Sequence, residues 1–100
     1  MCGVGIAWDA KVSGLRILSG ILTQGDEAAA INYDYQNNHI YSCSWGPADD
    51  GRAMDAPPRM VAEAFYKGIV KGRSGLGSLY VFATGNGGIS YDNWYVLFKL

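Results

Sequence analysis

Two short apolar runs, each ending abruptly in glycine and small polar residues, constrain the fold of this chain more than any other feature. The first leads into residues 44–51 (Ser-Trp-Gly-Pro-Ala-Asp-Asp-Gly), and the second leads into residues 83–88 (Ala-Thr-Gly-Asn-Gly-Gly). Runs of this kind predict strands of a parallel sheet, and ligands of such sheets bind outside the carboxyl ends of the strands. The two glycine-containing segments therefore predict one shared site.

The pattern predicts three strands. Residues 11–18 roughly alternate polar and apolar side chains, which is typical of a strand. Residues 40–44 form a short apolar run rich in β-formers, on which Cys43 is expected to be a small buried hydrophobe. Residues 78–83 are nearly all apolar, as a strand buried on both faces should be.

Two helices are predicted between these strands. The first is capped by Thr23, carries Asp26 and Glu27 in its first turn and closes at residues 37–38. The second opens at residues 55–58 (Asp-Ala-Pro-Pro) and is terminated by residues 72–75. Its predicted apolar stripe consists of Met60, Val61, Ala64, Phe65, Gly68 and Ile69. Strands that alternate with helices indicate an α/β fold with a parallel sheet and right-handed crossovers.

Charge and composition narrow the function classes. The net charge of −1 at pH 7 argues against non-specific binding to nucleic acid. No apolar run reaches the ~18–20 residues of a membrane span. Cys2 and Cys43 are too few for a disulfide framework and lack metal-ligand spacing. Carboxylates in predicted turns and at element ends suit a cationic ligand or a metal, although simple surface solvation fits as well: Asp26, Glu27, Asp49, Asp50, Asp55 and Asp92.

The residues after the second strand, Ser44, Trp45 and Gly46, have two interpretations. A strand edge that ends in this way can pair its backbone with an extended peptide, since glycine allows a close approach. A β-turn with a core tryptophan is the alternative. Asp49, in the turn that follows, would lie beside the same strand end, where a carboxylate could bind a guanidinium.

Asn86 lies between glycines after the third strand. Its amide could donate to a developing oxyanion, a contribution of roughly 3–4 kcal/mol in enzymes that use one, but an ordinary Asn-Gly turn also fits. A phosphate-binding glycine fingerprint is missing from this segment. His39, the single histidine, falls at the opposite end of a predicted strand and is expected to be structural. The residue types alone complete no catalytic triad.

Several segments resemble the catalytic domain of the kexin and furin group of subtilisin-like serine endopeptidases. They occur in the order of that family and comprise residues 2–8, 11–18, 40–47, 49–51, 72–73 and 75–88. The resemblance implies that residues 1–93 are a fragment of a subtilisin-like (peptidase S8) catalytic domain and that residues 94–100 are a divergent apolar tail. It implies a three-layer α/β fold, of which this chain would hold about three parallel strands and two main helices.

The resemblance also implies roles in substrate binding. The backbone of Ser44, Trp45 and Gly46 would pair with substrate residues before the scissile bond, Asp49 would line an arginine pocket, and Asn86 would contribute to the oxyanion hole.

Specificity and cofactor follow from the same resemblance. Glu27 and Asp55, with Leu22 nearby, would favour a basic residue four places before the cut. The implied substrate is a basic peptide or proprotein, and the implied location of the parent protein is the secretory pathway (Golgi). Calcium is the implied cofactor: Asp49 and Asp92 would serve one site, and the backbone of Met1 and Gly3 would serve another.

In the resembling family, the catalytic aspartate and histidine precede this segment and the serine follows it. The chain is therefore expected to supply substrate-binding and oxyanion elements of a calcium-dependent serine endopeptidase that cleaves after paired basic residues. By itself it is expected to be inactive and to fold poorly. Two alternatives stay open, namely a non-catalytic fragment that binds basic peptides and a small nucleotide-binding α/β module.

Overall fold

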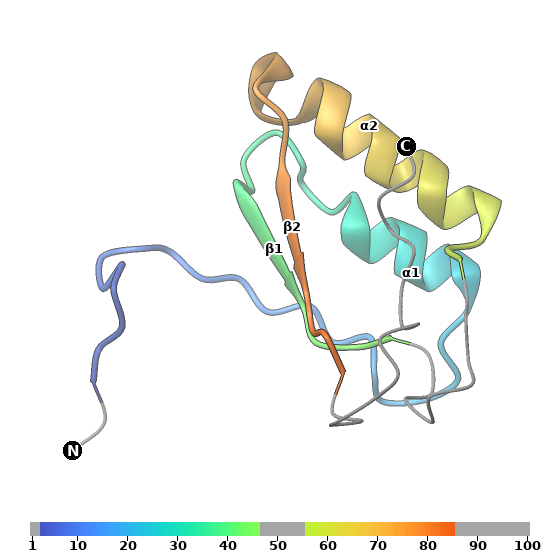
Figure 1. Cartoon of the computed structure of the whole chain (residues 1–100), viewed down its shortest axis with the longest axis horizontal. Helices are drawn as coiled ribbons and strands as arrows, with labels where there is room; N and C mark the ends of the chain where they lie inside the picture. Colours follow the sequence, from blue (N-terminus) through green and yellow to red (C-terminus); the bar gives the residue numbers. More distant parts are fainter. Residues whose placement is uncertain (1–2, 47–55, 86–100) are drawn as a thin grey trace.

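Two helices lie against one face of a two-stranded parallel sheet in the computed structural model, which describes residues 3–46 and 56–85 (Figure 1). The elements follow one another as α1 (Gln24–Ile31), β1 (Ile40–Cys43), α2 (Arg59–Gly75) and β2 (Leu79–Phe82). Each helix precedes a strand, and the two strands run parallel because α2 crosses over between them. The predicted α/β fold is confirmed in this partial form.

A capping box begins α1, as the position of Thr23 predicted. The Thr23 hydroxyl accepts the backbone N–H of Asp26 at 3.1 Å, and the Asp26 carboxylate accepts the backbone N–H of Thr23 at 3.3 Å. Hydrogen bonds from Thr23 hold the pKa of the Asp26 carboxyl below its ordinary value. The helix ends at Ile31, well before the predicted end at residues 37–38. The next residues form turns instead, with Asp34 at a positive φ of 49°.

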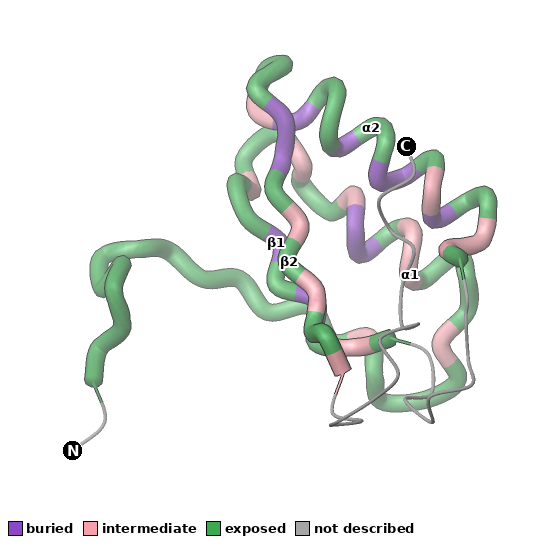
Figure 2. The backbone as a smooth tube through the Cα atoms, in the orientation of Figure 1, coloured by how far each residue is buried: buried purple, intermediate pink, exposed green. Residues whose placement is uncertain are grey.

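The buried face of α2 is narrower than the predicted stripe. Val61, Ala64, Phe65 and Gly68 are buried, as predicted. Met60 and Ile69 are exposed, because α1 and the sheet cover α2 from one side only (Figure 2). At its far end the backbone leaves helical geometry over residues 72–74, where the sequence predicted termination.

The two faces of the sheet differ sharply in burial. Tyr80 and Phe82 of β2 pack on the helices around the core of Ile31, Val61, Ala64 and Phe65. On the opposite face, Ile40, Leu79 and Val81 are each more than half exposed. The prediction that residues 78–83 are buried on both faces is therefore wrong for this chain, since no described element covers the second face.

Gly68 permits the close contact between α2 and β2. A Cβ atom at this position would overlap the hydroxyl of Tyr80. That hydroxyl donates to the carbonyl of Ile31 at 3.2 Å, so it ties β2 to the end of α1. Burial raises the pKa of Tyr80 further above neutral pH, where the phenol is already protonated and can donate.

Residues 11–18, predicted as a strand, form none in the structure. They belong to an exposed N-terminal segment that extends away from the helices (Figure 2). Alternation of polar and apolar residues favours a strand only when a neighbour supplies its hydrogen bonds, and the sheet in the described residues consists of β1 and β2. In that same part of the chain, neither helix is long and apolar enough to cross a membrane.

Candidate functional site

Both strands end at the same edge of the sheet, because they pair in parallel with Cys43 beside Phe82. Beyond this last pair, the backbone N–H of Ala83 donates to the carbonyl of Cys43 at 3.1 Å. This hydrogen bond holds together the two segments that follow β1 and β2 where they leave the sheet. The structure thus brings the beginnings of the two glycine-containing segments together at Cys43 and Ala83, and it describes these segments as far as Gly46 and Gly85.

Ser44, Trp45 and Gly46 continue from β1 in a non-strand conformation. Ser44 and Gly46 are exposed, whereas Trp45 is half-buried and packs against the core. The ring of Trp45 meets that of Phe82 edge-to-face, with centroids 5.8 Å apart. The tryptophan side chain is therefore anchored in the core, as the second interpretation expected, and peptide pairing by the residues on either side of it stays a prediction.

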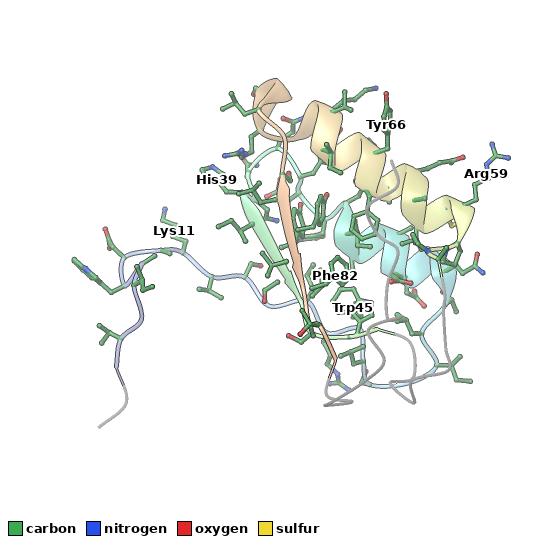
Figure 3. The ribbon with its side chains drawn as sticks, in the orientation of Figure 1. Lys11, His39, Trp45, Arg59, Tyr66 and Phe82 are labelled. Carbon is green, nitrogen blue, oxygen red and sulfur yellow. The ribbon has the colours of Figure 1, made fainter. Side chains whose placement is uncertain are left out.

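The indole of Trp45 connects this strand end to α1. Its Nε1 donates to Oε1 of Glu27 at 2.9 Å, and Glu27 lies in the first turn of α1 (Figure 3 labels Trp45). Two residues that the resemblance assigned to substrate binding are thereby joined across 18 positions of sequence. Neither periodicity nor motif spacing carries a signal for this bond, because it depends on how α1 packs beside β1.

Some of the other predicted site residues lie within the described part of the chain, and the rest lie outside it. Leu22 is half-buried just before the cap of α1, and Gly3 lies in the exposed N-terminal segment. The remaining ones fall outside the described residues: Met1, Asp49, Asp55, Asn86 and Asp92. Among residues 3–46 and 56–85, no group of three or more His, Cys, Asp or Glu side chains could hold a metal ion.

An open pocket of about 440 Å³ lies beside the same strand end and was not predicted. It is lined by residues 15–19 together with Ser42, Ser44 and Trp45. The sequence pattern missed it because residues 11–18 were expected to be in the sheet rather than beside it. Arg16, which contributes to the wall, makes this pocket poorly suited to a basic side chain.

Cys43 is buried at the end of β1, and His39 directly precedes the other end of this strand. Burial, and secondarily the negative charge of Glu27, raises the pKa of the Cys43 thiol to about 11. The thiol is thus protonated at neutral pH and is a poor nucleophile, which agrees with the predicted buried hydrophobe. His39 precedes β1 at the end of the sheet away from Trp45, and its carbonyl accepts the N–H of Leu79 at 2.9 Å (Figure 3).

Comparison with known proteins agrees with this arrangement of strands and helices. The profile of the subtilase family (peptidase S8) matches residues 1–96. The chain is 62% identical over 93 residues to a dibasic-processing endoprotease of Schizosaccharomyces pombe, covering 93% of this chain and 13% of that protein. It is 55% identical to kexin of Saccharomyces cerevisiae, covering 92% of this chain and 11% of that protein. Mouse furin is 47% identical, with 93% of this chain and 12% of furin covered.

The chain therefore spans between 11% and 13% of the length of these curated relatives. Its matches to kexin and furin agree with the segments that indicated the resemblance, and the family profile covers all the described residues. This chain belongs to the subtilase family, as a segment of the kexin type.

Proposed function

We propose that this chain supplies the substrate-binding part of a serine endopeptidase that processes proproteins after paired basic residues. The structural observation that carries the proposal is the carboxylate of Glu27, which is held by the side chain of Trp45, a residue flanked by the exposed Ser44 and Gly46. A peptide paired with that backbone would lie close to a negative charge, which favours a basic side chain. High identity to a relative named as a dibasic-processing endoprotease supports the same substrate class.

Each predicted residue has a role in this proposal. Asp49 lines the pocket for the arginine before the cut, and Asp55 with Leu22 assists Glu27 in favouring a second basic residue further upstream. Asn86 donates its amide to the oxyanion. The catalytic aspartate, histidine and serine are contributed by other parts of the complete protein, which acts in the secretory pathway (Golgi).

Calcium is the proposed cofactor. Asp49 and Asp92 offer carboxylate oxygens to one site, and Met1 and Gly3 offer backbone carbonyls to another. Hard oxygen donors of this kind are those that calcium prefers. Gly3, the member of this set among the described residues, is exposed, so its carbonyl is not enclosed by other parts of this chain.

The complete protein that carries this chain is expected to cleave a fluorogenic peptide ending in Lys-Arg before the fluorophore. Replacing the lysine or the arginine of the peptide by norleucine, which keeps the apolar stem and removes the charge, should lower kcat/KM by at least about tenfold per position. Initial rates with the three peptides measure this. Equal rates on all three would contradict the proposed specificity, whereas hydrolysis that needs no serine nucleophile would contradict the reaction class.

The 100-residue chain alone is expected to be inactive and to self-associate. Removal of one triad member leaves some catalysis because substrate binding persists, but nucleophile and base are proposed to lie elsewhere in the protein. The open sheet face of Ile40, Leu79 and Val81 favours association over a stable monomer. Light scattering after size-exclusion chromatography measures the association. Cleavage of the dibasic peptide by this chain, if abolished by Asn86→Ala, would contradict the expected inactivity. A monomer with a sharp cooperative melt would contradict the expected self-association.

A non-catalytic module that binds basic peptides is the second candidate, because the Glu27–Trp45 arrangement suits binding without any reaction. Calorimetry with a dibasic peptide separates the two functions. Binding that Asp49→Asn abolishes and Asn86→Ala leaves intact, without hydrolysis by the complete protein, would favour this candidate over the endopeptidase.

A further inference from the structure

We propose that Trp45 is a positioning residue for specificity: its indole N–H orients the Glu27 carboxylate and so sets how strongly a basic substrate residue is preferred. The inference rests on the proposed function, because an oriented carboxylate matters only if a basic peptide binds at the carboxyl end of β1. It assigns the side chain of Trp45 a task separate from that of its backbone.

The donor is rigid because the core holds it. The ring of Trp45 packs edge-to-face on Phe82, and Phe82 packs in the same manner on Phe65 at 5.5 Å. Phe65 is 5% exposed and belongs to the core cluster of α2 and α1. A continuous series of aromatic contacts therefore fixes the direction in which the indole N–H points.

The acceptor is a side chain that would otherwise be mobile. The backbone of Glu27 is fixed in the first turn of α1, where its N–H donates to the carbonyl of Thr23 at 3.0 Å. Its side chain has three rotatable bonds, and a half-exposed glutamate samples several rotamers when no partner selects one. The 2.9 Å bond from Trp45 selects one of them.

A neutral donor orients the carboxylate without neutralising it. Lysine or arginine in the place of Trp45 would cancel the charge that a basic substrate needs, whereas an indole N–H leaves it in place. The negative charge of Glu27 acts at the end of β1, where it contributes to the raised pKa of the Cys43 thiol. Trp45 thus combines a fixed direction with an undiminished negative charge.

Trp45 also relates the carboxylate to the substrate backbone. It stands between Ser44 and Gly46, two exposed residues whose backbone is proposed to pair with the peptide. One residue therefore sets both the position of the peptide and the direction of Glu27. Pre-organisation of this kind increases discrimination because the ordering cost is met before the substrate binds.

The experiment compares kcat/KM of the complete protein for two peptides that differ only four places before the cut, with arginine in one and norleucine in the other. The ratio of the two values is the basic-residue preference. Glu27→Gln keeps an acceptor for the indole and removes the charge, so the preference should fall by about tenfold or more. Trp45→Phe should lower the preference by about five- to tenfold.

In the double variant, the preference should be no lower than in Glu27→Gln alone, because both changes remove the same oriented charge. Trp8→Phe is the matched control: it makes the same chemical change at a tryptophan that is 74% exposed in the N-terminal segment, and the preference should stay as in the wild type. Any general loss from altered packing affects both peptides equally and cancels in the ratio.

The outcomes separate the two proposals. A preference unchanged by Glu27→Gln would contradict the role of Glu27 in the proposed function. A preference lowered by Glu27→Gln but not by Trp45→Phe, or additive losses in the double variant, would overturn the positioning role alone.

A second measurement covers the case in which Trp45→Phe fails to fold. In protein labelled with ¹⁵N-tryptophan, the indole N–H signal of Trp45 should differ between the wild type and Glu27→Gln, because a carboxylate acceptor is replaced by a neutral amide. An indole signal of Trp45 that is the same in both proteins at every pH would overturn the proposal.

Discussion

Replacing Asn86 by alanine is expected to lower kcat of the complete protein by roughly 10²–10³-fold on a dibasic peptide, with a much smaller change in KM. The proposed role of the amide is to donate to the oxyanion, whose charge develops only in the transition state. Loss of such a donor therefore slows the reaction without weakening ground-state binding to the same degree. The magnitude is the one known for removal of an oxyanion-hole asparagine from a subtilisin, not one obtained from this structure. Steady-state kinetics on purified protein measures it.

Asn37→Ala is the matched control for this variant. Asn37 is exposed in the turns after α1, where its amide donates to Oδ1 of Asp34 at 2.8 Å. Its replacement should change kcat less than about twofold, since surface substitutions of this kind shift free energies by about 0.5 kcal/mol or less. Wild-type kcat in Asn86→Ala would contradict the oxyanion role, and so would a loss of the same size in Asn37→Ala.

Replacing Phe65 by alanine is expected to destabilise the domain by about 3–5 kcal/mol. Phe65 is 5% exposed and meets Tyr80 and Phe82 edge-to-face, with ring centroids 4.9 Å and 5.5 Å away. Alanine would remove these contacts and leave a cavity between α2 and the sheet, because the surrounding backbone closes such a space only partly. Urea unfolding of the complete protein, followed by circular dichroism and by residual activity, measures the change in the free energy of unfolding.

Tyr66→Ala provides the comparison within the same helix. Tyr66 follows Phe65 directly but is 61% exposed, so its replacement should cost far less than that of Phe65. The helix propensity of the new residue is identical in both variants, and the difference between them therefore reports burial. Similar losses in the two variants would contradict the assignment of Phe65 to the core.

Local features of the chain were predictable because they depend on neighbouring residues. The cap of α1 at Thr23 needed only a hydroxyl followed three positions later by a carboxylate, and both hydrogen bonds are present. The two strands β1 and β2 were expected from short apolar runs between turn residues, and the structure places them close to the predicted positions. The apolar spacing of Val61, Ala64, Phe65 and Gly68 predicted which face of α2 is buried.

Errors arose where a partner outside the local sequence decides the outcome. Residues 11–18 have the alternation of a strand but no hydrogen-bonded neighbour among the described residues, so they stay outside the sheet. The first helix was predicted to continue to residues 37–38 but ends at Ile31, because residues 32–37 form turns. The second face of the sheet carries the apolar residues Ile40, Leu79 and Val81, as in a sheet covered on both sides. In this structure α1 and α2 cover only the other face.

Residue patterns were sufficient to predict both helices, strands β1 and β2, the cap of α1, the buried face of α2 and, through the segments of the kexin type, the family. The hydrogen bond from Trp45 to Glu27 depends on tertiary packing, since it joins a residue after β1 to one of α1 that is 18 positions away in the sequence. Its existence depends on how α1 packs beside the end of β1, and packing is set by the summed contacts of many side chains rather than by any local pattern. For the same reason, residue types alone could not show that the indole N–H of Trp45 orients the carboxylate of Glu27, as we propose.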